Sequence, residues 1–141
     1  MEKLYCTLDW SWEKLATYLS DIHQAFLKLQ KRFPQVYNAA IFWQELYCGE
    51  KILFLILDHQ QCFVAFVTVS LILDLKQIFC AQICDFAGAY PKEMADIISQ
   101  FECWARQNNI KKIISQGRIG WAKLLLRQNY KITSIKFEKD I

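Results

Sequence analysis

Proline and glycine are scarce in this chain, which has two prolines and four glycines in 141 residues. Disordered chains are rich in such residues and poor in apolar ones, whereas this chain is 54% hydrophobic and 15% aromatic. It also has no internal repeat and no low-complexity segment. The composition predicts a single folded domain over residues 1–141, tightly packed or burying further surface against a partner.

The sequence also lacks an apolar run long enough to cross a membrane. The longest such run, Cys62 to Leu73, is too short for a bilayer and is rich in β-branched and aromatic residues, as buried strands are. The first residues are polar and reach Asp9 too soon for the apolar core of a secretory signal. We therefore expect a cytoplasmic protein without a membrane span.

Closely spaced metal ligands are missing as well. None of the six cysteines forms a Cys-x-x-Cys pair; the nearest two are Cys80 and Cys84, and both histidines lie far from them in the sequence. Zinc sites need such ligands at short spacing, so the sequence predicts no metal site. Since no secretory signal is visible and most cysteines sit in apolar runs, we expect buried, reduced thiols.

Charge is distributed unevenly along the chain, whose net charge is +3. Residues 111–141 contain eight lysines and arginines and two acidic residues, which gives +6 there and leaves −3 for the first 110 residues. Such charges usually form a solvated surface; a docking surface for an acidic partner or a phosphate-bearing ligand is the alternative. The basic stretch lacks interleaved exposed aromatic residues, so no nucleic-acid partner is expected.

Hydrophobic periodicity predicts an alternation of helices and strands in the order β-α-α-β-β-β-α-β-α-β. The predicted strands cover residues 4–8, 52–57, 62–73, 77–87, 112–115 and 132–137, and the predicted helices cover 11–33, 36–48, 92–107 and 122–126. The first helix should end at Pro34, and the second at Gly49. Residues 52–57 are apolar on both faces, which is typical of a central strand covered on both sides.

The most distinctive pattern lies in the last quarter of the chain. Gly117 and Gly120 flank Arg118, so the backbone there can turn tightly or let another group approach closely. Trp121 and a leucine-rich helical stretch follow, and Asn129 can take the left-handed conformation that ends a helix.

Gly-Arg-x-Gly-Trp, a short leucine-rich helix and the pair Asn129-Tyr130 together resemble the C-terminal signature of small GNAT (Gcn5-related N-acetyltransferase) proteins encoded by tailed phages and prophages. The predicted element order is also that of the GNAT fold. The resemblance implies an α/β fold, with a mixed, mostly antiparallel sheet and helices on both of its faces.

GNAT enzymes hold the pyrophosphate of acetyl-coenzyme A on backbone N–H groups between the fourth strand and the next helix, in a loop of pattern Gln/Arg-x-x-Gly-x-Gly/Ala. The corresponding loop here contains Ala87, Gly88, Ala89, Tyr90 and Lys92. It has one glycine and lacks that spacing. Asp85 and Glu93 add negative charge and Pro91 removes a donor, so we interpret the loop as degenerate.

The family also uses a tyrosine on the last helix as the general acid that reprotonates the leaving thiolate. With Asn129-Tyr130 aligned on the family's Gly-Phe pair, that position holds Leu125, which cannot transfer a proton, and Tyr130 falls in a packing position. The carboxylates considered as bases are three expected at strand ends and one in mid-helix, none of them convincing: Asp58, Asp74, Asp85 and Glu102. We therefore assign no catalytic residue.

Arg118 and Trp121 leave two interpretations open. In the first, Trp121 fills the core beneath the last helix, and Arg118 satisfies strand-end carbonyls or pairs with an acid such as Asp85. In the second, Arg118 faces a gap between the fourth and fifth strands and binds a carboxylate, a phosphate or an acidic partner group. Gly117, Arg118, Gly120 and Trp121 are thus the candidate ligand or partner site.

Three functions remain open. The main one, by resemblance, is a non-catalytic or cryptically catalytic phage-type protein without a cofactor. It would act through protein contacts in the virion, in assembly or on the host, with a second copy of the chain as one candidate partner. The second is an acetyl-coenzyme A-dependent N-acetyltransferase with a degenerate cofactor loop. The third is a binding module for a small anionic ligand, built on Arg118 and the basic C-terminal quarter.

Overall fold

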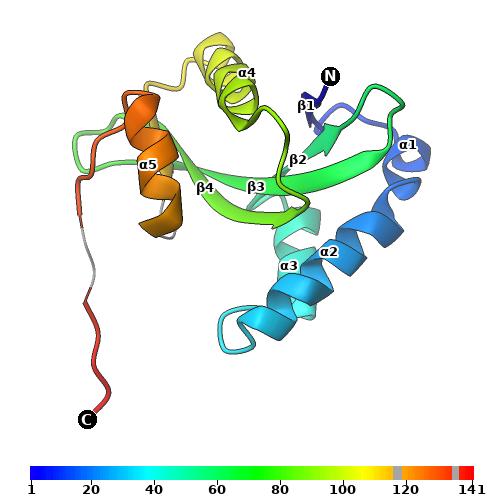
Figure 1. The fold of residues 1–141 in the computed structure, drawn as a ribbon, viewed down its shortest axis with the longest axis horizontal. Helices are drawn as coiled ribbons and strands as arrows, with labels where there is room; N and C mark the ends of the chain where they lie inside the picture. The colour runs from blue at the N-terminus through cyan, green and yellow to red at the C-terminus, as the bar shows by residue number, and fades with distance from the viewer. Residues whose placement is uncertain (116–118, 135–136) are drawn as a thin grey trace.

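The computed structural model of the protein describes residues 1–115, 119–134 and 137–141, which form a five-stranded sheet with helices on both faces (Figure 1). The strands follow one another across the sheet in chain order: β1 (Lys3–Cys6), β2 (Ile52–Leu57), β3 (Phe63–Leu73), β4 (Phe79–Gly88) and β5 (Lys112–Ser115). The first four are antiparallel to their neighbours, and β5 pairs in parallel with β4. The mixed, mostly antiparallel sheet predicted from the resemblance is confirmed.

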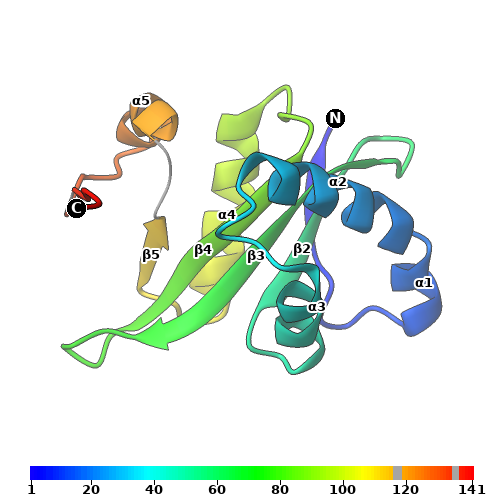
Figure 2. The same ribbon diagram turned by 90° about the horizontal axis from the view of Figure 1, so that it is seen from below.

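Helices cover the two faces of the sheet unequally, as two views at right angles show (Figures 1 and 2). One face carries α1 (Trp12–Ala16), α2 (Leu19–Arg32) and α3 (Ala39–Tyr47), and the other carries α4 (Met94–Gln107) and α5 (Ile119–Arg127). The prediction of one continuous helix over residues 11–33 was wrong. The helix is interrupted at Thr17 and Tyr18, where the Tyr18 hydroxyl donates to the carbonyl of Gln61 at 2.8 Å and holds the chain against the neighbouring hairpin.

Each face of the sheet buries its own apolar core. On one face, the buried stripe of α2 packs on alternate residues of β2, beginning with Leu53. On the other face, α4 packs on the intervening residues, among them Phe54, whose ring lies 5.5 Å from that of Phe101. All six residues of β2 are buried, which confirms the prediction of a central strand covered on both sides.

Strand β4 runs past the end of β5 and contains an irregularity on the way. The two strands pair only from Cys80 to Ile83, and β5 ends at Ser115. Against β3, Thr68 pairs with Asp85 and Val69 with Ile83, so Cys84 is an extra residue on β4. Such a bulge bends its strand and redirects side chains. Beyond Ile83, β4 therefore has no partner strand on the β5 side among the described residues.

The prediction of a final strand over residues 132–137 was wrong for those of its residues that the structure describes. Residues 131–134 and 137–141 have no regular secondary structure and run away from the sheet after α5 (Figure 1), while residues 135 and 136 lie outside the description. Ile132 and Phe137 are exposed in this tail. An alternating pattern favours a strand, but the strand needs a neighbouring edge to pair with.

The cysteines correct another expectation. All six are free thiols, but only Cys80 is buried, Cys6 and Cys84 are half-buried, and the other three are exposed. An apolar stretch predicts buried cysteines, but Cys62 is exposed in the turn before β3 and Cys103 is exposed on α4. Among the described residues, no cluster of three histidine, cysteine or acidic side chains could hold a metal ion. None of the described helices is long and apolar enough to cross a membrane.

Candidate functional site

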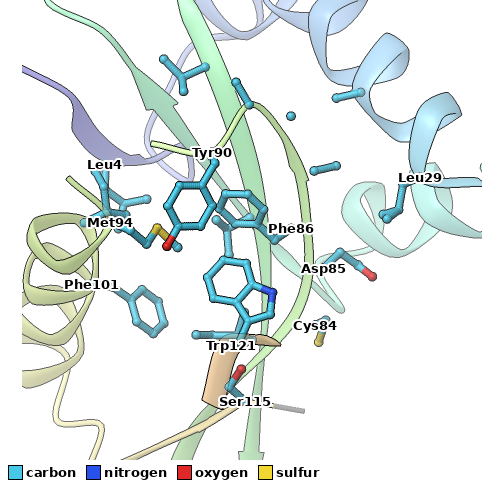
Figure 3. A pocket seen from close by; sticks show the side chains of 18 of the residues that line it. Leu4, Leu29, Cys84, Asp85, Phe86, Tyr90, Met94, Phe101, Ser115 and Trp121 are labelled. Carbon is cyan, nitrogen blue, oxygen red and sulfur yellow. The ribbon is translucent and has the colours of Figure 1, made fainter. Parts of the chain in front are cut away.

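A large cavity lies where β4 runs past β5, and its volume is about 1160 Å³. Residues from both faces of the sheet line it (Figure 3). On the α4 and α5 face these include Phe86, Phe101 and Trp121, and on the α2 face they include Leu29 and Asp85. The end of β4 beyond Ile83 thus lies between the parts of one cavity on the two faces of the sheet, the α4–α5 compartment and the α2 compartment.

Trp121 forms the aromatic wall of the cavity together with two residues of β4 and its following loop. Its ring lies 5.4 Å from that of Phe86, nearly at right angles, and 5.8 Å from that of Tyr90 (Figure 3). The side chain is half-buried and packs against the α4 core cluster. Trp121 therefore contributes to the core and also presents a face to the cavity.

Of the other three members of this candidate site, the structure describes the backbone of one. Gly117 and Arg118 lie outside the described residues. The backbone of Gly120 belongs to the first turn of α5, directly before Trp121. The motif therefore places Trp121 at the cavity by starting α5 there, and the role of Arg118 stays a prediction.

Gly88 has a structural reason for being glycine. Its φ is +119°, and a Cβ added there would lie 2.6 Å from both the Ala65 Cα and the Val64 carbonyl oxygen. The next N–H, that of Ala89, donates to the same Val64 oxygen at 2.9 Å. Ala87 is buried against the α2 face. These three residues of the expected cofactor loop thus continue the pairing of β4 with β3, and the glycine permits close approach of β3.

The rest of that loop offers few donors to a phosphate. The Lys92 N–H donates to Glu2 Oε1 at 2.7 Å, and the buried Pro91 has no N–H. Tyr90 is largely exposed, with its ring at the cavity wall. No side chain caps the N-terminus of α4 at Glu93. A carboxylate of the chain itself therefore occupies one N–H of the loop that a pyrophosphate would use.

Asp85 is the buried charged group at the cavity. It is 7% exposed and accepts hydrogen bonds at Oδ2 from Thr68 Oγ1 at 2.5 Å and from Lys51 Nζ at 3.2 Å. Burial alone would lower the pKa of the Lys51 ammonium, but Asp85, aided by Glu45 at 3.5 Å, outweighs it and holds that pKa above its usual value. Asp85 lies inside β4 and not at a strand end, and its cation among the described residues is Lys51.

Tyr130 has a polar partner that the sequence did not indicate. Asn129 takes the left-handed conformation expected of it, with φ +67°, and the Tyr130 N–H closes the helix end on the Leu125 carbonyl at 3.0 Å. The half-buried phenol lies beside the Glu102 carboxylate on α4. Burial, together with Glu102, raises the pKa of Tyr130. No spacing rule connects residues 102 and 130, so only the packing of α5 beside α4 shows this pair.

Tyr130→Phe should destabilise the protein by about 1 kcal/mol, because it removes the polar contact of the half-buried phenol with the Glu102 carboxylate. Urea unfolding measures the loss. Gln107→Ala, on the exposed side of α4, is the control and should change the free energy of unfolding by less than about 0.5 kcal/mol. Equal stability of Tyr130→Phe and the wild type would show that the phenol does not fasten α5 to α4.

No protein-family model matches the chain, and a comparison with curated protein sequences gives no match. Solved structures do resemble it. A putative acetyl transferase from Pyrococcus furiosus has a TM-score of 0.74 at 18% identity, over 100% of both chains. Glucosamine-6-phosphate N-acetyltransferase from Arabidopsis thaliana has a TM-score of 0.64 at 10% identity, over 99% of this chain and 98% of that one. An aminoglycoside acetyltransferase from an uncultured soil metagenomic sample has a TM-score of 0.62 at 12% identity, over 100% of this chain and 97% of that one.

These similar structures support the GNAT fold that the resemblance implies. They give no support to a phage or prophage origin. The names of these three proteins are those of acetyltransferases, and none points to a virion or assembly protein. They agree better with the second of the three functions left open by the sequence than with the first. At such low identities they establish structure alone: the chain has the GNAT fold, with the cavity where β4 continues past the end of β5.

Proposed function

We propose that the chain is an acetyl-coenzyme A-dependent N-acetyltransferase. The observation that carries this function is the single cavity that joins the two faces of the sheet beyond the last β4–β5 pair. Acetyl transfer needs a donor and an acceptor amine held in contact, and a cavity open to both faces lets each arrive from its own side. The GNAT fold shared with known acetyltransferases supports the same reading.

The residues on the α4 and α5 face fit the thioester arm of the donor better than its phosphates. Phe86, Trp121 and Leu124 form an apolar and aromatic wall along which a flexible, largely uncharged arm can lie. The loop after β4 has two of its N–H groups already bonded, at Ala89 and Lys92. Bound acetyl-coenzyme A would supply an activated acetyl thioester; Arg118 is proposed to contact its phosphates.

On the α2 face, Asp85 is suited to holding the acceptor amine. Both hydrogen bonds that Asp85 accepts from described residues end on Oδ2, so among these residues Oδ1 is left for a donor in the cavity. Thr68 and Lys51 fix the carboxylate in place, so its position does not depend on the ligand. An N–H of the acceptor that donates to Oδ1 would be oriented toward the divergence of β4 and β5, where the donor arm ends.

Calorimetric titration with acetyl-coenzyme A tests this function. We expect micromolar binding and a loss of about ten-fold or more in affinity for Trp121→Ala, because the variant removes the aromatic wall. Arg118→Ala should weaken binding by several-fold. Trp12→Ala is the matched control, since Trp12 is exposed on α1 and away from the cavity. No heat at millimolar acetyl-coenzyme A, or unchanged binding by Trp121→Ala, would refute the proposal.

A role in protein contacts, the main expectation from the sequence, is supported by large apolar side chains at the surface. Tyr47, Leu75 and Phe137 are each almost fully exposed, and burying such groups on a partner is favourable. None of the three lines the cavity. A protein partner and an acetyl-transfer site are therefore compatible on this chain.

A further inference from the structure

The α2 compartment of the cavity has a charge pattern of its own. Helix α2 buries one stripe against the sheet and turns the adjacent stripe, Asp21, Gln24, Lys28 and Arg32, toward the cavity mouth. These four positions follow steps of three and four residues, which places them on one side of a helix. All four are exposed, and Ala25 and Leu29 form the apolar floor beneath them.

The two cations in this stripe lie next to each other at the cavity mouth. Lys28 and Arg32 are four residues apart, about 6 Å along the helix axis, a spacing at which like charges repel. Within the described part of the chain, neither forms an ion pair with a carboxylate. Lys31 and Arg32 both lie in the last turn of α2, where a cation interacts favourably with the helix C-terminus. Of the two, Arg32 lines the cavity and Lys31 does not.

Asp85, the buried carboxylate on β4, lines the same cavity as these two cations. A molecule bound there can meet Lys28 and Arg32 as well as the Asp85 carboxylate, whose Oδ1 accepts no hydrogen bond from the described residues, and Asp21 is a further carboxylate of the stripe. Such a lining matches a ligand that carries both a donor N–H and a negative charge. A neutral amine would use Asp85 and leave the cations unpaired.

We infer that the acceptor is a small primary amine that also carries a carboxylate or a phosphate, with the amine at Asp85 and the anion between Lys28 and Arg32. The inference rests on the proposed acetyl transfer, and it adds the substrate class. The two side chains fix the orientation of the acceptor from the rim, while Asp85 fixes it from the floor.

Two matched pairs of acceptors test this class, with release of free coenzyme A thiol as the readout. Ethanolamine and O-phosphoethanolamine differ by a phosphate, and butylamine and 4-aminobutyrate differ by a carboxylate. We expect at least one anionic member to exceed its neutral partner in kcat/KM by about ten-fold or more, as one charge-assisted contact supports. The pair with the larger ratio distinguishes phosphate from carboxylate.

Lys28→Gln/Arg32→Gln should remove that preference through a higher KM for the anionic amine, without changing the neutral amine or the KM for acetyl-coenzyme A. The matched control is Lys31→Gln, which should behave as the wild type. Lys31 directly precedes Arg32 on α2 and lies outside the cavity lining. Equal use of both members of each pair would overturn the inference. A higher KM for acetyl-coenzyme A in the double variant would also overturn it, because the cations would then serve the donor.

Calorimetry separates failure of this inference from failure of the proposed function. If the protein binds acetyl-coenzyme A but transfers to none of the four amines, the same amines are titrated onto the acetyl-coenzyme A-loaded protein. If acetyl-coenzyme A itself does not bind, they are titrated onto the free protein. Tighter binding of an anionic member, lost in Lys28→Gln/Arg32→Gln, supports the inference in either case, and equal binding within both pairs rejects it.

Discussion

Asp85→Ala should lower the free energy of unfolding by about 3 kcal/mol, because it leaves Lys51 partly buried without its main counter-charge. The side chains of the pair are 7% and 18% exposed, so water replaces the lost interaction poorly. Thr68, which is fully buried, also loses the acceptor of its hydroxyl. Urea unfolding followed by tryptophan fluorescence measures the change.

Two further variants separate the causes of that loss. Asp85→Asn keeps an oxygen for Thr68 and removes only the charge, so it should destabilise the protein less than Asp85→Ala. Lys51→Met removes the cation and keeps the length of the side chain. In a double-mutant cycle, Lys51→Met/Asp85→Ala should cost less than the two single changes together. Additive losses would show that the ion pair contributes nothing beyond the packing of each side chain.

The second large effect is expected at Gly88, where alanine should destabilise the protein by about 4 kcal/mol or prevent folding. Left-handed backbone costs a residue with a Cβ of order 1–3 kcal/mol, and overpacking adds a similar amount. The new Cβ would lie 2.6 Å from the backbone of Ala65 and of Val64, which cannot move without breaking the β3–β4 pairing.

Gly49→Ala is the matched control for Gly88→Ala. Gly49 also has a positive φ, +78°, but nothing lies within 4 Å of an added Cβ. Its cost should therefore be the conformational part alone, about 1 kcal/mol. Comparison of urea midpoints and of the yield of folded protein tests the difference. Equal losses in the two variants would show that close approach of β3 is not the reason for glycine at position 88.

Elements with a regular spacing of apolar residues could be predicted from the amino-acid sequence alone. The stripes of α2 and α4 and the two-sided burial of β2 follow from the spacing of apolar residues, because each pattern matches the repeat of its own element. The motif around Gly120 and Trp121 predicted the GNAT fold, and Asn129 predicted the end of α5. These features depend on residues a few positions apart.

Features that depend on residues far apart in the chain became visible only in the folded protein. At the break before α2, the Tyr18 hydroxyl contacts the Gln61 carbonyl, 43 residues away, and the counter-charge of Asp85 lies 34 residues away at Lys51. The expected last strand has the right alternation, yet its described residues found no sheet edge, since pairing requires a neighbour that local sequence does not supply. The cavity likewise arises because β4 continues past β5 and joins two faces, a relation between elements that no single stretch encodes.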